Sequence, residues 1–283
     1  MTRSLKPNAI ARAFLDACLA ELDALKPGNV HRFGDGDSMT VADFAASAEA
    51  AAPLIGRAAL GVGERIRLAA AATQRAVGHN TNLGIILLAA PLAAAALDRR
   101  GGDLASKLRL VLQELTVADA SEAYRAIRDT KPGGLGEAPR HDVASEPEVS
   151  LLEAMRAAEG YDRIAWNYAH GFADIFELGR TWLKQGHERW GEGPWAVTRV
   201  YLGFLAHLPD TLIERKFGAR SAALVREEAA AIEAGFAESQ TAETMIAPLL
   251  AFDRSLKERE LNPGTSADLT VATLFAATLE SAE

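Results

Sequence analysis

The longest hydrophobic stretch of the chain runs from Leu83 to Leu97 without a charged or polar side chain. A helix with no polar face must be buried on all sides, and this one is too short to cross a membrane. A polar turn precedes it, in which Asn80 or Thr81 is predicted to be the N-cap. We therefore predict a central buried helix over about residues 82–97, kinked or ended in its first half at Pro91.

Amphipathic stretches at helical spacing fill most of the remaining chain, and loops rich in proline and glycine separate them. Thr40 is predicted to cap one of these helices, with Asp43 completing a weak capping box. No alternating strand pattern, fixed repeat or linker divides the sequence. The pattern predicts a single all-α globular domain over residues 1–283, with roughly a dozen helices around the buried one. The further helices are expected at residues 8–25, 41–60, 64–77, 103–116, 119–128, 150–159, 162–169, 171–184, 195–207, 219–238, 242–259 and 269–279.

Composition and charge narrow the range of partners. The chain has 283 residues, of which 49% are hydrophobic, and a formal net charge of −8. This charge argues against a nucleic-acid-binding surface. Cys18 is the only cysteine, which excludes a disulfide and a cysteine zinc site within one chain. Because the first residues lack an apolar signal region and no segment could span a bilayer, we expect a cytoplasmic protein without a membrane partner; a homodimer is left open.

Three loops between predicted helices share a Pro-Gly core. One interpretation is that they only end helices, since the residue before proline avoids the helical region and glycine permits a turn. The other is that they hold phosphates, because glycine lets backbone N–H groups approach an anion and two of the loops add a lysine. The turn before the central helix is a further anion site, because free N–H groups and the positive dipole end face it. The loops are Lys26-Pro27-Gly28-Asn29, Lys131-Pro132-Gly133-Gly134 and Asn262-Pro263-Gly264-Thr265.

Acidic loop residues are candidates for binding Mg²⁺, which usually takes one or two carboxylates beside the phosphates of its substrate. For each of them, a solvated loop acid or a helix cap is the alternative. His31 and His79 lie in polar turns, where a general acid–base role and a structural hydrogen bond are both open. The acidic candidates are Asp35, Asp37, Asp129, Asp210 and Asp268.

In their order along nearly the whole chain, these loops resemble those of the triphosphoribosyl-dephospho-CoA synthase family. The resemblance implies an all-α transferase that takes ATP, displaces adenine and joins the triphosphoribosyl unit to the ribose 2′-hydroxyl of 3′-dephospho-CoA. The product is the precursor of the prosthetic group of citrate lyase or malonate decarboxylase. The motifs that carry the resemblance are Lys26-Pro27-Gly28-Asn29-Val30-His31-Arg32, Asn80-Thr81-Asn82-Leu83-Gly84, Asp210-Thr211-Leu212-Ile213-Glu214-Arg215-Lys216-Phe217-Gly218 and Asn262-Pro263-Gly264-Thr265-Ser266-Ala267-Asp268-Leu269.

Departures from the usual family motifs leave two alternatives open. The synthases read Leu-Val-Asp, His-Asp-Met and His-Lys at three places in these motifs. The form found here is similar to relatives in methanogens and in methylotrophs that use tetrahydromethanopterin-type C1 cofactors, so a different acceptor is one alternative. A non-catalytic helical nucleotide-binding protein is the other. At those places this chain has Asn29-Val30-His31, Asp37-Ser38-Met39 and Asn82-Leu83.

The resemblance also implies roles for individual residues, with ATP as substrate, Mg²⁺ as its metal and a small-molecule acceptor. The loops at 26–43, 78–84, 129–136 and 262–268 are expected to converge on one pocket. The expected catalytic residues are His31 as acid or base, Asp37, Asp210 and Asp268, and the expected metal ligands are Asp35, Asp37 and Asp268. The expected nucleotide-binding residues are Lys26, Pro27, Gly28, Asn29, Arg32, Asn80, Thr81, Asn82, Gly84, Lys131, Gly133, Gly134, Arg215, Lys216, Gly264, Thr265 and Ser266.

Overall fold

The computed structural model describes residues 5–34 and 39–282. Within these ranges the regular structure is helical, apart from one isolated bridge between His31 and Gly34, which confirms the all-α prediction. The elements are α1 (Pro7–Asp23), α2 (Val41–Ile55), α3 (Val62–Val77), α4 (Leu83–Leu97), α5 (Leu104–Gln113), α6 (Val117–Thr130), α7 (Leu151–Ala158), α8 (Arg163–Ala169), the π-helix η1 (Asp174–Gly179), α9 (Arg180–Trp190), α10 (Pro194–His207), α11 (Thr211–Phe217), α12 (Ala219–Glu238), the 3₁₀-helix η2 (Ala242–Met245), α13 (Ile246–Glu258) and α14 (Gly264–Ala282).

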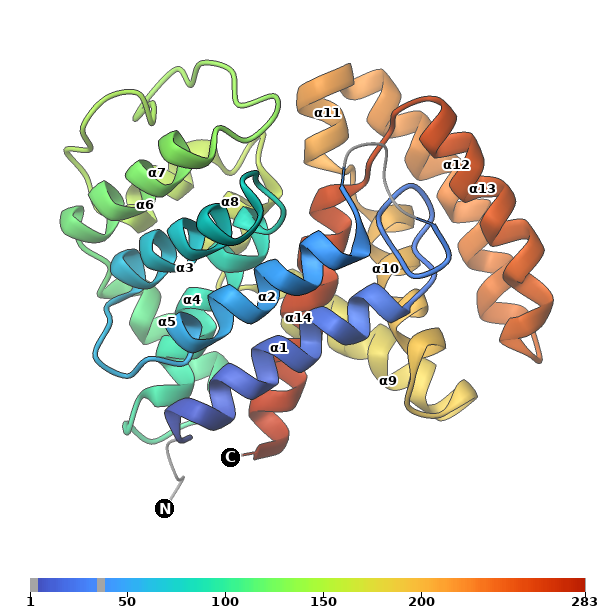
Figure 1. The fold of residues 1–283 in the computed structure, drawn as a ribbon, viewed down its shortest axis with the longest axis horizontal. Coiled ribbons are helices and arrows are strands. Elements are labelled where there is room, and N and C mark those ends of the chain that lie inside the picture. The colour runs from blue at the N-terminus through green and yellow to red at the C-terminus, as the bar shows by residue number, and fades with distance from the viewer. Residues whose placement is uncertain (1–4, 35–38, 283) are drawn as a thin grey trace.

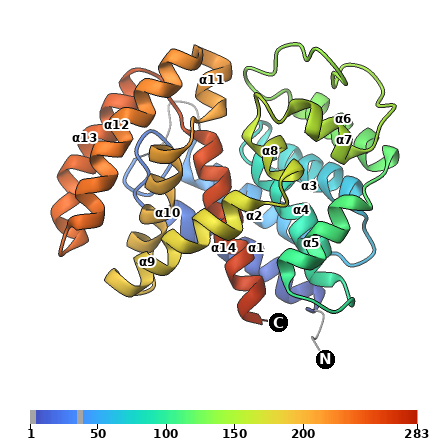
Figure 2. The same cartoon turned by 180° about the vertical axis from the view of Figure 1, so that it is seen from behind.

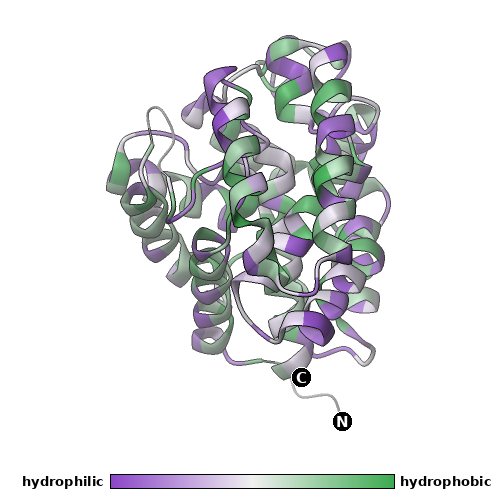
Figure 3. Ribbon diagram, turned by 90° about the vertical axis from the view of Figure 1, so that its right-hand side faces the viewer, coloured by the Kyte–Doolittle hydropathy of each residue, from purple (hydrophilic) through white to green (hydrophobic). Residues whose placement is uncertain are grey.

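Helix α14 runs through the middle of the molecule, and α1, α4 and α10 pack against it (Figure 1). Helices α3 to α8 gather on one side of α14 and α9 to α13 on the other, a division that is also visible from behind (Figure 2). The outer helices carry both hydrophilic and hydrophobic stretches, as expected of amphipathic helices that bury one face (Figure 3). The N-terminal end of α14 therefore lies where the two groups meet.

Helix α4 is buried along nearly its whole length, as its apolar pattern predicts. It does not end at Pro91 but continues to Leu97. Proline lacks the N–H that would donate to the carbonyl of Leu87, and the hydroxyl of Tyr168 donates to that oxygen instead, at 2.6 Å. A side chain from α8 thus supplies the missing hydrogen bond. No helix in the described ranges is long and apolar enough to cross a membrane.

The predicted N-cap of α4 is wrong by one or two residues. Asn82 occupies the cap position, and its side chain makes no capping hydrogen bond. The Oδ1 atom of Asn80 accepts from the N–H of Leu83 at 3.1 Å, so the turn still satisfies the first N–H of the helix. The capping box of Thr40 and Asp43 at α2 is present as predicted.

Several helix boundaries differ from the sequence prediction. The expected helix at 171–184 is a short π-helix that continues into α9, and the one at 242–259 is a short 3₁₀-helix followed by α13. Helix α11 was not predicted, because its short Asp-Thr segment shows too few apolar positions for a periodicity to emerge. Helix α14 begins at Gly264 rather than 269, so Asp268 lies inside a helix and not in a loop.

Asp210 explains why α14 starts early. Its Oδ2 atom accepts from the N–H and the hydroxyl of Ser266, at 2.8 and 2.9 Å, in the first turn of α14. Its Oδ1 atom accepts from the N–H groups of Leu212 and Ile213 in α11. One buried carboxylate thus caps two helices that are separated by about fifty residues of sequence.

Candidate active site

Two of the three Pro-Gly loops interlock beneath the site. Gly28 has φ +81°, and a Cβ there would lie 2.9 Å from both the carbonyl oxygen of Leu261 and the ring of Pro263. The N–H of Gly28 donates to Oδ1 of Asp253 at 2.8 Å. The Nδ2 atom of Asn29 donates to Oδ1 of Asn262, also at 2.8 Å. Glycine is needed here for the left-handed conformation and for the close approach of the two loops.

The third Pro-Gly loop, at residues 131–134, packs against the end of α11. A Cβ at Gly133 would lie 2.7 Å from Cε of Lys216, and one at Gly134 would lie 3.3 Å from Cβ of Arg215. These contacts place the backbone of the loop beside two cations. The loop therefore lies against the end of α11.

Between these loops lies a cavity of about 300 Å³, the lower end of the range for small-molecule sites. Residues from all four predicted loops reach it, together with α4, α6, α7, α8, α11 and α14. Of the residues predicted to bind or react with substrate, those that line the cavity are Asn29, Asn80, Thr81, Asn82, Gly84, Gly133, Arg215, Lys216, Gly264, Thr265 and Asp268.

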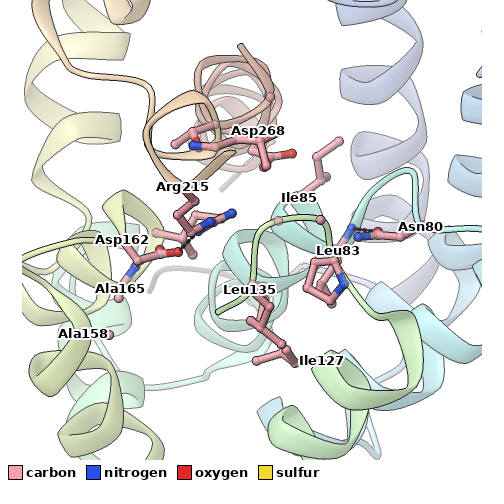
Figure 4. A pocket seen from close by; sticks show the side chains of 18 of the residues that line it. Asn80, Leu83, Ile85, Ile127, Leu135, Ala158, Asp162, Ala165, Arg215 and Asp268 are labelled. Carbon is pink, nitrogen blue, oxygen red and sulfur yellow. Dashed lines mark hydrogen bonds and ion pairs between the residues drawn. The ribbon is translucent and has the colours of Figure 1, made fainter. Parts of the chain in front are cut away.

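One end of the cavity is rich in carboxyl and amide groups. Asp268 projects into it from α14, above Ile85 in Figure 4, and Glu21 reaches it from α1. Within the described residues, no hydrogen bond or ion pair engages the carboxyl group of Asp268. Burial raises its pKa well above the ordinary value, and the nearby carboxylates Asp210 and Glu21 add to this effect.

Asn82 adds an unpaired donor at the same end. Its Oδ1 atom accepts from the hydroxyl of Thr73 at 3.0 Å, which fixes the orientation of the amide. The Nδ2 atom is buried and has no acceptor within the described ranges. A buried donor without a partner is costly unless a ligand accepts from it. Asn82 is therefore suited to hydrogen-bond a substrate in the cavity.

Asp268 lies directly against the first turn of α4. A Cβ at Gly84 would lie 2.0 Å from Oδ2 of Asp268 and 2.9 Å from Cδ1 of Ile164. Only glycine leaves room for the carboxyl group in this position. Gly84 is thus required for steric reasons, which the sequence motif alone did not show.

We expect Gly84→Ala to reduce any activity that depends on Asp268 by about 100-fold, because a displacement of about 1 Å can cost that much. The methyl group should push the carboxyl group aside and leave the fold intact, since alanine favours a helix. Gly160→Ala is the matched control, because no atom lies within 4 Å of a Cβ at that position. Equal activity of both variants would show that the position of Asp268 is unimportant.

The cavity also has a cationic side and an apolar wall. Arg215 forms an ion pair with Asp162, whose other oxygen caps α8 through the N–H of Ala165 at 3.0 Å (Figure 4). Lys216 adds a second cation at this side. The wall opposite Asp268 is apolar. It includes Ile127, Leu135, Ala158 and Ala165 (Figure 4).

Lys26 and His31 lie in the interior beside the cavity and do not line it. Lys26 is fully buried, and its Nζ donates to Glu21 and to Asn29. Burial lowers the pKa of Lys26, and Glu21 opposes this shift. His31 is also fully buried, with Nε2 at 3.2 Å from Oδ1 of Asp253, and burial lowers its pKa. The phosphate role of Lys26 and the acid–base role of His31 stay predictions.

The other predicted site residues do not line the cavity or lie outside the described residues. Asp210 and Ser266 form the double cap described above. Arg32 lies at the surface, 3.8 Å from Asp23. Asp35 and Asp37 lie outside the described residues. Those that are described but do not line the cavity are Lys26, Pro27, Gly28, His31, Arg32, Lys131, Gly134, Asp210 and Ser266.

Sequence reasoning missed Glu21 and Asp162 among the carboxylates of the cavity. A signal for Glu21 was present, because it shares the helical face of Phe14, Cys18 and Leu25 and is a charged residue on an apolar stripe. Burial raises the pKa of Glu21, and its ion pair with Lys26 opposes the shift. No comparable signal marked Asp162, whose contact with Arg215 depends on the tertiary fold.

The described carboxylates of the cavity do not form a dedicated metal site. Over residues 5–34 and 39–282, no three histidine, cysteine, aspartate or glutamate side chains lie close enough together to hold a metal ion. A magnesium ion bound mainly by substrate phosphates would need no such cluster.

Comparison with known proteins identifies the family of this chain. The profile of the family CitG, ATP:dephospho-CoA triphosphoribosyl transferase, matches residues 7–283. The crystal structure of a candidate triphosphoribosyl-dephospho-CoA synthase from Archaeoglobus fulgidus is 26% identical, with a TM-score of 0.66, over 84% of this chain and 99% of that chain. Among curated proteins, no relative matches.

Proposed function

The chain belongs to the CitG family of ATP:dephospho-CoA triphosphoribosyl transferases, and we propose that the cavity at the N-terminal end of α14 is where the transfer takes place. In this proposal ATP and 3′-dephospho-CoA bind together, adenine leaves, and the triphosphoribosyl unit joins the acceptor hydroxyl. The observation that carries the proposal is Asp268, a partly buried carboxyl group that lines the cavity and has no hydrogen-bond or ion-pair partner among the described residues.

The charges in the cavity suggest how ATP lies. Arg215 and Lys216 are the cations beside the backbone of the 131–134 loop, so the triphosphate is placed there. Guanidinium and ammonium groups form strong, charge-assisted hydrogen bonds with phosphate oxygens. The amide groups of Asn80 and Asn82 lie at the other end, where they can hydrogen-bond the adenine ring. The ribose then lies between the two ends, close to Asp268.

Asp268 is proposed to protonate the leaving adenine. Breaking the bond between ribose and adenine builds oxocarbenium character at the anomeric carbon, as in glycoside cleavage, and the departing base needs a proton. Because burial raises its pKa, Asp268 holds a proton at higher pH than an ordinary aspartate does. A carboxyl group kept neutral by its surroundings is an established kind of proton donor in enzymes.

Mg²⁺ is proposed to enter with ATP, as part of the nucleotide substrate. The described residues offer no cluster of three protein ligands, and Mg²⁺ prefers phosphate oxygens, water and one or two carboxylates. Its effect would be to reduce the charge of the triphosphate.

The test is to incubate the purified protein with ATP, Mg²⁺ and 3′-dephospho-CoA, and to follow free adenine by chromatography and the joined product by mass spectrometry. The proposal expects both products in equal amounts. Binding of ATP without release of adenine would contradict it and would favour a non-catalytic nucleotide-binding protein.

We expect Lys216→Ala to weaken ATP binding by about tenfold to a hundredfold, because a hydrogen bond to a charged group contributes about 1.5–3 kcal/mol. Calorimetric titration with Mg²⁺-ATP measures the change. Lys184→Ala is the control, because Lys184 is exposed on α9 and does not line the cavity. Equal affinities of the two variants would exclude the triphosphate from this side of the cavity.

A further inference from the structure

We propose that Glu21 is a further catalytic residue, which takes the proton of the acceptor hydroxyl as that hydroxyl attacks the ribose. The inference rests on the proposed function, since it assigns a base to the transfer placed in this cavity. Glu21 is only 4% exposed, yet its side chain lines the same cavity as Asp268. It lies in α1, outside all the loop motifs.

Its two carboxylate oxygens have different surroundings. The Nζ atom of Lys26 donates to Oε1 of Glu21 and, at 3.1 Å, to Oδ1 of Asn29. Asn29 in turn donates to Asn262, so the network extends across both interlocked loops. Within the part of the chain that the structure describes, no donor reaches Oε2 of Glu21. The network holds the carboxylate in place and leaves one oxygen for a substrate hydroxyl.

The two carboxyl groups at this end of the cavity differ in their charged neighbours. Glu21 contacts Lys26, a fully buried cation, and this contact favours the ionised form of Glu21. Asp268 forms no ion pair with a described cation, and Arg215, which is paired with Asp162, only partly opposes the rise of its pKa. Pairs of titratable groups in unlike surroundings are a common way for one site to contain both an acid and a base. Glu21 is the group that can accept a proton and Asp268 the group that can donate one.

The step balances without any other reactant. The O–H bond of the acceptor breaks, its proton passes to Oε2 of Glu21, and its oxygen forms the new bond to the anomeric carbon. The bond from that carbon to the adenine nitrogen breaks, and its electron pair leaves with the base, which receives the proton of Asp268. After product release, proton exchange with solvent returns Glu21 and Asp268 to their starting forms.

The experiment compares the wild type with Glu21→Gln, Glu21→Asp and the double variant Glu21→Gln/Lys26→Met. The double variant is included because a buried lysine left without its partner can destabilise the fold, whereas removal of both charges is often tolerated. With dephospho-CoA as acceptor, we expect both glutamine variants to lose about 10²- to 10⁴-fold in kcat, and Glu21→Gln to retain its ATP affinity. The aspartate variant should recover part of the loss.

Azide distinguishes a base from a structural residue. It can attack the ribose without losing a proton, so adenine release with azide as acceptor should be as fast in Glu21→Gln as in the wild type. The fall of kcat at low pH should also disappear in the glutamine variants. The titratable groups that face Glu21 are Lys26, Asp268, Cys18 and Tyr201, and all but Lys26 are unchanged in the double variant.

Equal slowing with azide and with dephospho-CoA would overturn the proposal, as would an unchanged kcat. A wild-type protein that releases no adenine with either acceptor would instead refute the proposed function. The two failures are therefore distinguishable.

Discussion

Replacement of Asp268 by asparagine is expected to slow adenine release by about 10²- to 10⁴-fold, the usual contribution of a general acid. Asparagine has nearly the same size and leaves the packing against Gly84 in place, so ATP affinity should change little. Only the proton that Asp268 would give to the leaving base is lost. Single-turnover measurement of adenine release, combined with calorimetric titration of ATP, separates the two effects.

The control for this variant is Asp129→Asn, since Asp129 is an exposed carboxylate outside the cavity. An undiminished rate in Asp268→Asn would refute the role of Asp268 as the acid. A loss of affinity that appears only when Mg²⁺ is present would point instead to Asp268 as a metal ligand.

The same variant should be more stable than the wild type, by an amount that grows with pH. The pKa of Asp268 is raised in the folded protein, so the folded state holds this proton more tightly than the unfolded state does. The wild type therefore loses stability as pH rises from about 4, the unfolded pKa of aspartate, to the folded pKa. Asparagine does not titrate, so urea unfolding at a series of pH values should show the two proteins diverging upward from about pH 4. Parallel curves would contradict this sign.

The central helix was predictable because all of its residues are apolar, so every face of it must be buried. Fifteen residues without a polar side chain permit no other arrangement in a helical protein. The effect of Pro91 was not predictable, since the hydroxyl that satisfies Leu87 comes from α8, far away in sequence. Sequence shows which hydrogen bond a proline removes, but not which tertiary neighbour replaces it.

The loops of the site were predictable from their chemistry, but the role of each residue within them was less so. The four loops share glycine, lysine and carboxylate residues at helix ends, and residues from all four line one cavity. The sequence could not show that Lys26 does not line that cavity and instead donates to Glu21, because the loop that carries it folds back onto α1. The sequence also predicted the same catalytic role for Asp210 and Asp268. In the structure both oxygens of Asp210 accept hydrogen bonds from helix ends, whereas the carboxyl group of Asp268 has no such partner among the described residues.

This contrast between the two carboxylates leads to the largest expected effect on stability. Asp210→Ala should lower the free energy of unfolding by roughly 3–5 kcal/mol, because it removes the caps of α11 and α14 together and leaves buried donors unpaired. The donors that lose their acceptor are the N–H groups of Leu212, Ile213 and Ser266 and the hydroxyl of Ser266.

Asp103→Ala is the comparison that isolates burial as the cause of this large loss. Asp103 also caps a helix, through the N–H of Ser106 at 2.8 Å, but it lies at the surface, where water replaces the lost acceptor. Its removal should cost only about 0.5–2 kcal/mol. Urea unfolding of both variants measures the difference. If Asp210→Ala costs no more than Asp103→Ala, then α14 does not depend on α11 for its first turn, and the position of Asp268 against Gly84 must be fixed by the packing of α14 on α4 alone.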